Sequence, residues 1–322
     1  MTGPAAAQPT TAAVRRLAAV RRSAGFATRF LGRTDGLVGV IILGFFAFIA
    51  AFPGIFVGPL EDVTTATGLP LHAPYAAHVF GTDELGRDIL NLTVHAARIS
   101  MTIGLMATII TIVVGAVVGI VSGYVGGVLD TILMRIADFF LVLPTVVLAL
   151  ILAPVILDVI GAGAEFGGIR ATLLVIVVVI GLTSWATTAR IIRSQVLSLK
   201  ERMFVDRARV IGSGPGRIMR RHILPNVVNL IVAQAVLTFA GAVFTETTLS
   251  FIGLGDPVAP SWGQVLNTAQ AAGAPGLGAW WYIAPPAVCV VLVVLSFTLV
   301  GNALDDILNP KSASRLRVVD EP

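Results

Sequence analysis

The sequence predicts an all-α membrane protein with six spanning helices and with both ends of the chain in the cytoplasm. Of its 322 residues, 56% are hydrophobic and only 12% are charged, about half the charged share of an ordinary soluble domain. The apolar residues form continuous runs, unlike the alternating pattern of outer-membrane barrel strands. Basic residues gather on alternate connections between these runs, which fixes the direction in which the chain is threaded.

Six apolar stretches are long enough to cross a hydrocarbon core of about 30 Å at about 1.5 Å per residue. They cover residues 36–57, 99–122, 136–157, 171–189, 228–250 and 282–303. Because about 35 residues precede an apolar segment of about 20, the first stretch is predicted to be an uncleaved span and not a signal peptide.

These stretches predict an organisation in four parts. Residues 1–35 form a cytoplasmic tail, 36–98 the first span with an external loop, 99–304 a five-helix core, and 305–322 a second cytoplasmic tail. The core includes a long cytoplasmic connection, residues 190–226.

The orientation follows from the basic residues, since 19 of the 22 lysines and arginines then lie inside and only Arg87, Arg98 and Arg170 lie outside. This bias predicts a multi-pass membrane protein with both ends of the chain in the cytoplasm. It also accounts for the net charge of +4. The basic residues hold the cytoplasmic connections on the inner side and contact the headgroups of membrane lipid. No nucleic-acid partner is predicted.

Several kinds of chemistry are not expected in this chain. The single cysteine, Cys289, lies inside the sixth stretch, and the four histidines are scattered without ligand spacing, so no disulfide framework and no metal site are predicted. The only lysines, Lys200 and Lys311, do not follow a glycine, so the chain has no G-x4-G-K-[ST] phosphate loop. We therefore predict no catalytic residue, no cofactor in this chain and no enzyme activity.

The cytoplasmic connection predicts an ordered pair of short helices. Ser198 to Glu201 has the pattern of a capping box that starts the first helix, and Phe204, Ala208 and Ile211 recur on one face. The expected end of the first helix is Gly212 in a left-handed conformation, Pro215 begins the second, and Leu224-Pro225 ends it. Such a cationic amphipathic pair either lies on the membrane surface or docks into a groove on a cytoplasmic partner.

This connection resembles the EAA loop of ABC importer permeases, E-A-A-x3-G-x9-I-x-L-P. The match runs from Asp206 to Gly212 and from His222 to Pro225, and it departs from the pattern at Asp206, Arg207 and His222. The resemblance implies that the loop couples the chain to a separate ATPase. The residues implied in this role are Phe204, Asp206, Arg207, Ala208, Arg209, Gly212, Leu224 and Pro225.

Further motifs bring the resemblance to the C-type permease subunits of dipeptide, oligopeptide and nickel importers. They are Phe80 to Asp88, Ala97 to Ser100, Gly123 to Gly127, Leu249 to Gly255 and Pro260 to Gly263, in order over roughly 80–310. The resemblance implies a type I importer permease fold and an alternating-access half-pore for peptides. The alternative is that the same machinery imports a nickel chelate, glutathione or another small solute.

The same resemblance implies partners for this chain. These are a second permease subunit in a heterodimer, one or two ABC ATPase subunits that bind ATP and Mg, and an external substrate-binding protein. The external segments 58–98 and 251–281 are the candidates for facing that receptor, through Asp83, Arg87, Asp88, Asp256 and Trp262. The aromatics Trp262, Trp280, Trp281 and Tyr282 either anchor the chain at the headgroup level or contact a partner.

An ion-coupled secondary transporter is the alternative from another class, and it needs titratable groups near the midplane of the membrane. Asp138 is expected at the cytoplasmic mouth of the third span, where it either pairs locally with Arg135 or is hydrated at the interface. Glu246 is expected near the outer interface, about 18 residues into the fifth span. Neither placement favours ion coupling.

Glycines recur every four residues along the end of the second span, at Gly115, Gly119, Gly123 and Gly127. Such a series of small residues lets two helix backbones approach closely. We expect a tight contact with a neighbouring span that slides as the pore opens, the alternative being simple tolerance of glycine in membrane helices.

Overall fold

The computed structural model describes residues 32–62, 64–161 and 163–308. Most of the two predicted tails therefore lies outside the described residues. The elements, in chain order, are α2 (Thr34–Ala51), α3 (Pro53–Phe56), α4 (Ile89–Val125), α5 (Gly127–Val142), α6 (Thr145–Ile160), β1 (Glu165–Phe166), β2 (Ile169–Arg170), α7 (Ala171–Lys200), α8 (Met203–Val210), α9 (Pro215–Ile218), η1 (Met219–Ile223), α10 (Leu224–Leu249), η2 (Ser250–Leu254), α11 (Trp262–Ala271) and α12 (Trp280–Leu308).

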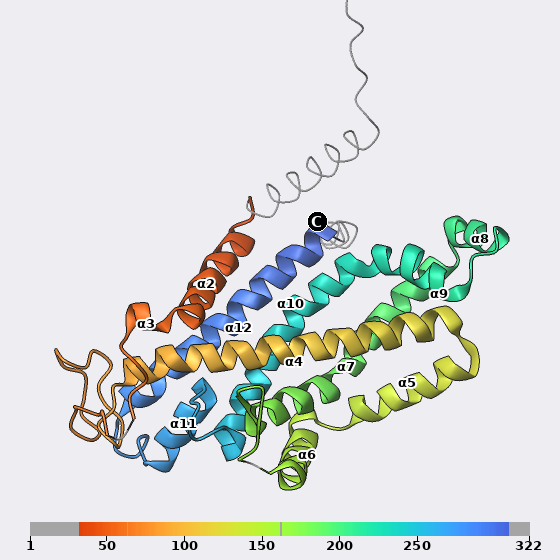
Figure 1. The fold of residues 1–322 in the computed structure, drawn as a ribbon. Helices are drawn as coiled ribbons and strands as arrows, with labels where there is room; N and C mark the ends of the chain where they lie inside the picture. Colours follow the sequence, from red (N-terminus) through yellow and green to blue (C-terminus); the bar gives the residue numbers. More distant parts are fainter. Residues whose placement is uncertain (1–31, 63, 162, 309–322) are drawn as a thin grey trace, which may run out of the picture.

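The chain folds as a bundle of long helices, which confirms the predicted fold class (Figure 1). The 37-residue α4 and the 30-residue α7 lie against each other and form the centre of the bundle. Helix α10 packs on α4 and α12, and α12 packs on α2. The short α8 lies at one end of the bundle, whereas the loop after α3 and helix α11 lie at the other (Figure 1).

Within the described residues, five helical segments are long and apolar enough to cross a membrane, or up to six if a bent pair of helices, α5 and α6, is one span. Segments Thr34–Ala51, Ile89–Val125, Ala171–Lys200, Pro215–Leu254 and Trp280–Leu304 are the five. Each includes or overlaps one of the predicted apolar stretches.

The third predicted stretch, 136–157, is not one straight helix. It contains the junction of α5 and α6, whose axes differ by 95°. Pro144 explains the break, because its ring disfavours helical backbone in the residue before it. Leu143 accordingly has extended backbone, with φ −80° and ψ 129°.

Helix α4 begins ten residues before the predicted apolar stretch 99–122. Asp88 caps it, since the carboxylate accepts a hydrogen bond from the amide of Leu90 at 2.9 Å. The first turns of α4 are buried even where they are polar, because Asn91 binds the carbonyl of Pro59 and the amide of Glu61 in the external loop. Packing and these hydrogen bonds extend the helix beyond the apolar stretch that the sequence shows.

The glycines Gly115, Gly119 and Gly123 of α4 lie against α7. An added Cβ would come within 2.7 Å of the Thr188 Cβ at Gly115 and within 2.6 Å of the Ala189 carbonyl oxygen at Gly119. Gly127 does not belong to this contact. It lies in the turn into α5 with φ 62°, and a Cβ added there would meet nothing within 4 Å.

Candidate functional site: the cytoplasmic knob and the polar face

Residues 202–218, with α8 and α9, protrude from one end of the bundle, which the sequence predicts to be the cytoplasmic end, and are called the knob (Figure 1). Its first helix begins at Met203, so the predicted capping box is wrong. Ser198 lies inside the last turn of α7, which runs on to Lys200. Arg202 occupies the N-cap position of α8 without a side-chain cap.

The knob is held to the bundle by a small apolar core. Val205 and Ala208 are buried and pack with Ile218, Ile223 and Val227. The predicted apolar face of Phe204, Ala208 and Ile211 is thus shifted, because only Ala208 of the three is buried. Phe204 is 37% exposed and Ile211 is 83% exposed.

The opposite side of α8 presents apolar side chains to solvent. Met203, Val210 and Ile211 are 70%, 87% and 83% exposed, and with Asp206 and Arg207 they line a shallow hollow of about 420 Å³. Exposed apolar clusters with a polar rim mark contact sites for other molecules. The hollow is therefore the candidate coupling surface of this chain.

Arg209 connects α8 with the end of α4. Arg209 forms an ion pair with Asp206 at 2.9 Å, and its guanidinium lies 5.7 Å from the ring centroid of Tyr124 at the end of α4. A cation over an aromatic face is attracted by the ring quadrupole.

The turn between the two short helices has the backbone that the sequence predicts at Gly212. Its φ is 82°, in the left-handed region that glycine enters without steric cost. Pro215 starts α9, also as predicted. The predicted end at Leu224-Pro225 is wrong, because α9, η1 and α10 run on without a break and Pro225 sits in the first turn of α10.

One continuous helical path therefore connects the knob with the external end of the bundle. It runs from Pro215 to Leu254 over 40 residues and contains π-helical segments near both ends, η1 and η2. Single π turns inside helices occur frequently at functional positions.

A polar face lies between the helices α4, α6, α7 and α10. A cavity of about 280 Å³ is lined there by hydroxyl and amide side chains. The polar face consists of Thr111, Thr145, Ser184, Thr187, Thr188, Gln234, Thr238 and Thr245. None of these lining side chains is charged. Polar groups at membrane depth usually face the bundle interior or a water-filled path, so this surface is the candidate lining of a translocation route.

Sequence reasoning did not single out these residues. The three on α10 recur at helical spacing, since Gln234, Thr238 and Thr245 are separated by 4 and 7 residues. This stripe of polar residues on an apolar helix was the available signal. The contributions of α6 and α7 depend on tertiary packing.

Among the residues expected to face a receptor, three have buried side chains, which corrects that expectation. Asp83, Asp256 and Trp262 are at most 1% exposed. The Asp256 carboxylate binds Arg170 at 3.1 Å, and the indole of Trp262 donates to the carbonyl of Thr93 at 3.0 Å. These residues organise the outer end from within.

Of the outer aromatics, only Trp280 has the large exposure, 65%, expected of a headgroup anchor. Tyr282 is buried and donates a hydrogen bond to Glu84 at 2.6 Å. Trp281 is half-buried, and its indole nitrogen lies 3.4 Å from the carbonyl oxygen of Thr82.

Two acidic residues have partners that the sequence did not indicate. Asp138 pairs with Arg190 of α7 and not with Arg135, and α5 packs against α7. Glu246 is near the external end of α10, as expected, and its side chain is fully buried within the chain. One of its carboxylate oxygens accepts from the Ser250 hydroxyl at 2.8 Å.

Residues 115–314, which contain the knob, match the family described as binding-protein-dependent transport system inner membrane component. The chain belongs to this family. It is 37% identical over 282 residues to the dipeptide transport system permease protein DppC of Bacillus subtilis, with 85% of this chain and 81% of that protein covered. It is 35% identical to the oligopeptide transport system permease protein OppC of the same organism, with 88% of each covered.

The fold of this inner-membrane transport component also has a solved counterpart. A chain of the MetNI methionine ABC transporter, in an inward-facing conformation, matches with a TM-score of 0.53 and 18% identity, over 67% of this chain and 96% of that one. The type I importer permease fold expected from the resemblance is confirmed.

Proposed function

We propose that the chain is the membrane-spanning permease subunit of an ATP-driven peptide importer and that it receives energy through the knob. The exposed apolar surface of Met203, Val210 and Ile211 carries this proposal. A helix with such a face suits a groove on a partner protein. In this account the partner is one or two ABC ATPase subunits, which bind ATP and Mg.

The family and its relatives support the rest of the assembly. Relatives named for dipeptide and oligopeptide transport support peptide cargo, and the family description supports an external binding protein that delivers it. A second permease subunit completes the pore as a heterodimer in lipid. ATP binding closes the ATPases, the knob moves with them, and the spans rock to open the pore outward.

The polar face fits a peptide in chemical terms. Hydroxyl groups and the Gln234 amide both donate and accept hydrogen bonds, as the amides of a peptide backbone do. Because the lining side chains of this face carry no charge, they do not discriminate strongly between acidic and basic cargo. In this account selectivity for length and side chain belongs mainly to the receptor.

The proposal is tested by reconstituting the chain with its second permease subunit, ATPase and receptor in liposomes. Uptake of labelled dialanine should require both ATP and the receptor. Unlabelled peptides, glutathione and a nickel chelate, added as competitors, identify the preferred cargo. Uptake that needs no ATP and follows a proton or sodium gradient would instead establish a secondary transporter.

A further inference from the structure

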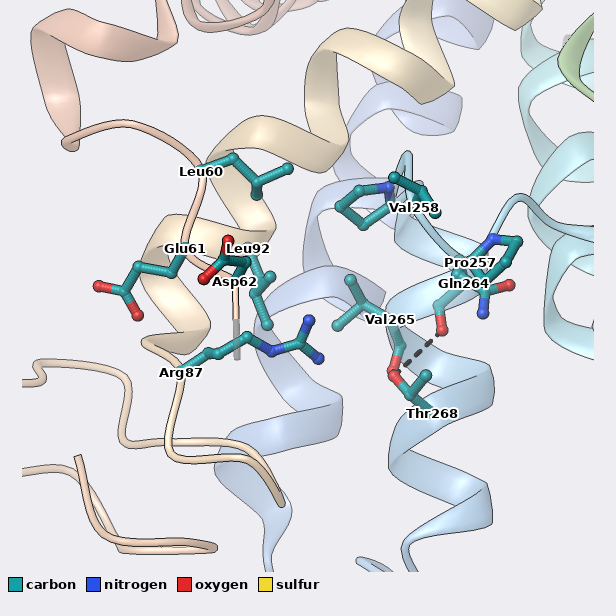
Figure 2. A pocket seen from close by; sticks show the side chains of 11 residues that line it. Leu60, Glu61, Asp62, Arg87, Leu92, Pro257, Val258, Gln264, Val265 and Thr268 are labelled. Atoms are coloured by element: carbon teal, nitrogen blue, oxygen red, sulfur yellow. Dashed lines mark hydrogen bonds between the residues drawn. The ribbon is translucent and has the colours of Figure 1, made fainter. Parts of the chain in front are cut away.

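A second cavity lies at the external end of the chain, away from the polar face. It has a volume of about 320 Å³ and lies between the external loop before α4 and helix α11 (Figure 2). Leu60, Leu92 and Val265 contribute apolar walls, Arg87 contributes a positive charge, and Glu61 and Asp62 contribute negative charges. One oxygen of Glu61 already accepts the amide of Asp88 at 2.7 Å. Cavities that bind small molecules start at about 300 Å³ and combine apolar walls with a few placed polar groups.

The guanidinium of Arg87 is held at one edge of this cavity. Its Nε donates to Asp83 at 2.6 Å, and Asp83 is fully buried and accepts two backbone amides as well. Figure 2 shows the guanidinium extending into the space between the Leu60–Asp62 segment and α11. In the described part of the chain, no group accepts a hydrogen bond from its terminal nitrogens. Two such donors in one plane match a carboxylate.

Asp62 supplies the opposite charge at the same cavity. Its Oδ1 accepts hydrogen bonds from Thr64 and Thr65, and its Oδ2 has no partner among the described residues. The hydrogen bond from the Thr64 hydroxyl, with those from the amides of Thr64 and Thr65, lowers the pKa of the Asp62 carboxyl. Asp62 is therefore ionised at neutral pH.

Asp62 and Arg87 do not form an ion pair with each other in the described structure, although both line the cavity. Two opposite charges left apart in this way complement a molecule that carries both charges at its ends. A short peptide with free termini has this chemistry and adds apolar side chains for the walls.

We propose that this cavity is an external binding site for short zwitterionic peptides. The peptide carboxylate binds the terminal nitrogens of Arg87, and the peptide ammonium binds Asp62. The inference rests on the proposed function, because it assumes peptide cargo and an external location for this end. It adds a cargo contact outside the membrane-embedded polar face, where a peptide leaving the receptor is held.

The test measures binding of dialanine to the purified full chain in lipid nanodiscs, without receptor or ATPase, by saturation-transfer NMR. Free dialanine should bind, and both its N-acetyl and its C-amide analogues should bind at least about tenfold more weakly, since each lacks one charge. These ligand changes leave the Asp83–Arg87 pair intact.

Two variants localise the site. Val258→Trp should abolish dialanine binding, because Val258 lines the cavity and is 64% exposed, so a large ring there fills the cavity and not the core. The matched control is Leu69→Trp, since Leu69 is 67% exposed and does not line the cavity. Asp62→Asn keeps the Oδ1 acceptor and should make dialanine bind no better than its N-acetyl analogue.

Three results would overturn the inference: no saturable dialanine signal, equal binding of the capped analogues, or unchanged binding in Val258→Trp. If wild-type chain does not bind dialanine but Val258→Trp weakens receptor docking, the cavity is a protein contact instead. Failure of the proposed function is distinguishable, because it appears as absent ATP-driven uptake in the complete complex whatever the nanodisc result.

Discussion

The guanidinium of Arg193 on α7 and the carboxylate of Asp130 on α5 form a two-point ion pair, with Nε–Oδ1 and Nη2–Oδ2 distances of 2.6 Å each. The Ser122 hydroxyl of α4 donates to the same carboxylate at 2.5 Å. This single carboxylate therefore ties three helices together at the cytoplasmic end, next to the knob.

A double-mutant cycle measures that pair. Asp130→Asn and Arg193→Gln should each lower the free energy of unfolding in detergent by about 1–3 kcal/mol, because each leaves a partly buried charge without its partner. The double variant should lose less than the sum of the two. The exposed pair Asp206–Arg209 is the control, with an expected coupling energy of about 0.5 kcal/mol or less. Equal coupling energies at the two pairs would show that the Asp130–Arg193 pair does not hold the helices together.

The contact of α4 with α7 predicts a strong effect of a single methyl group. Gly119→Ala should destabilise the chain by about 1–3 kcal/mol, since the new Cβ would meet the Ala189 carbonyl oxygen at 2.6 Å. Gly44→Ala in α2 is the matched control, because nothing lies within 4 Å of its Cβ position, and it should be neutral or slightly stabilising. Thermal unfolding of both variants decides the matter.

Much of the helical layout could be predicted, because apolar runs of about 20 residues are strong signals in a membrane protein. The bend at Pro144 and the early start of α4 at Ile89 were missed. The bend could have been predicted from Pro144, because the residue before a proline disfavours helical backbone. The early start could not, because it depends on contacts between Asn91 and the external loop.

The candidate site was predictable in part. Gly212 and Pro215 carry backbone signals that depend only on local geometry, and both positions agree with the structure. The capping box at Ser198 failed because tertiary packing along α4 carries α7 on to Lys200. The buried state of Asp256 and Trp262 depends on partners more than 80 residues away in sequence, which no local pattern reveals.

The turn in the knob predicts a difference between two neighbouring glycines. Gly212→Val should cost about 1–2 kcal/mol or more, because φ is 82° there. Gly214→Val should be tolerated, since Gly214 has extended backbone with φ −66° and ψ 158° and open space around it. Limited proteolysis of the knob should therefore accelerate only in Gly212→Val, and equal acceleration in both would argue against a backbone cause.

The orientation predicts which cysteines a membrane-impermeant thiol reagent reaches. In a Cys289→Ala background, Thr67→Cys should be labelled only from outside, and Arg217→Cys only from inside, since both positions are exposed. Labelling of Arg217→Cys from outside in sealed cells would overturn the topology.

Receptor-stimulated ATP hydrolysis by the reconstituted complex tests the central claim most directly, with Ile211→Ser compared with Val128→Ser. Both side chains are exposed, 83% and 77%, but only Ile211 belongs to the coupling surface. Ile211→Ser should lose most of the stimulation, or lose the ATPase from the complex, and Val128→Ser should retain both. Full stimulation and ATPase retention in Ile211→Ser would contradict transmission through this surface of the knob.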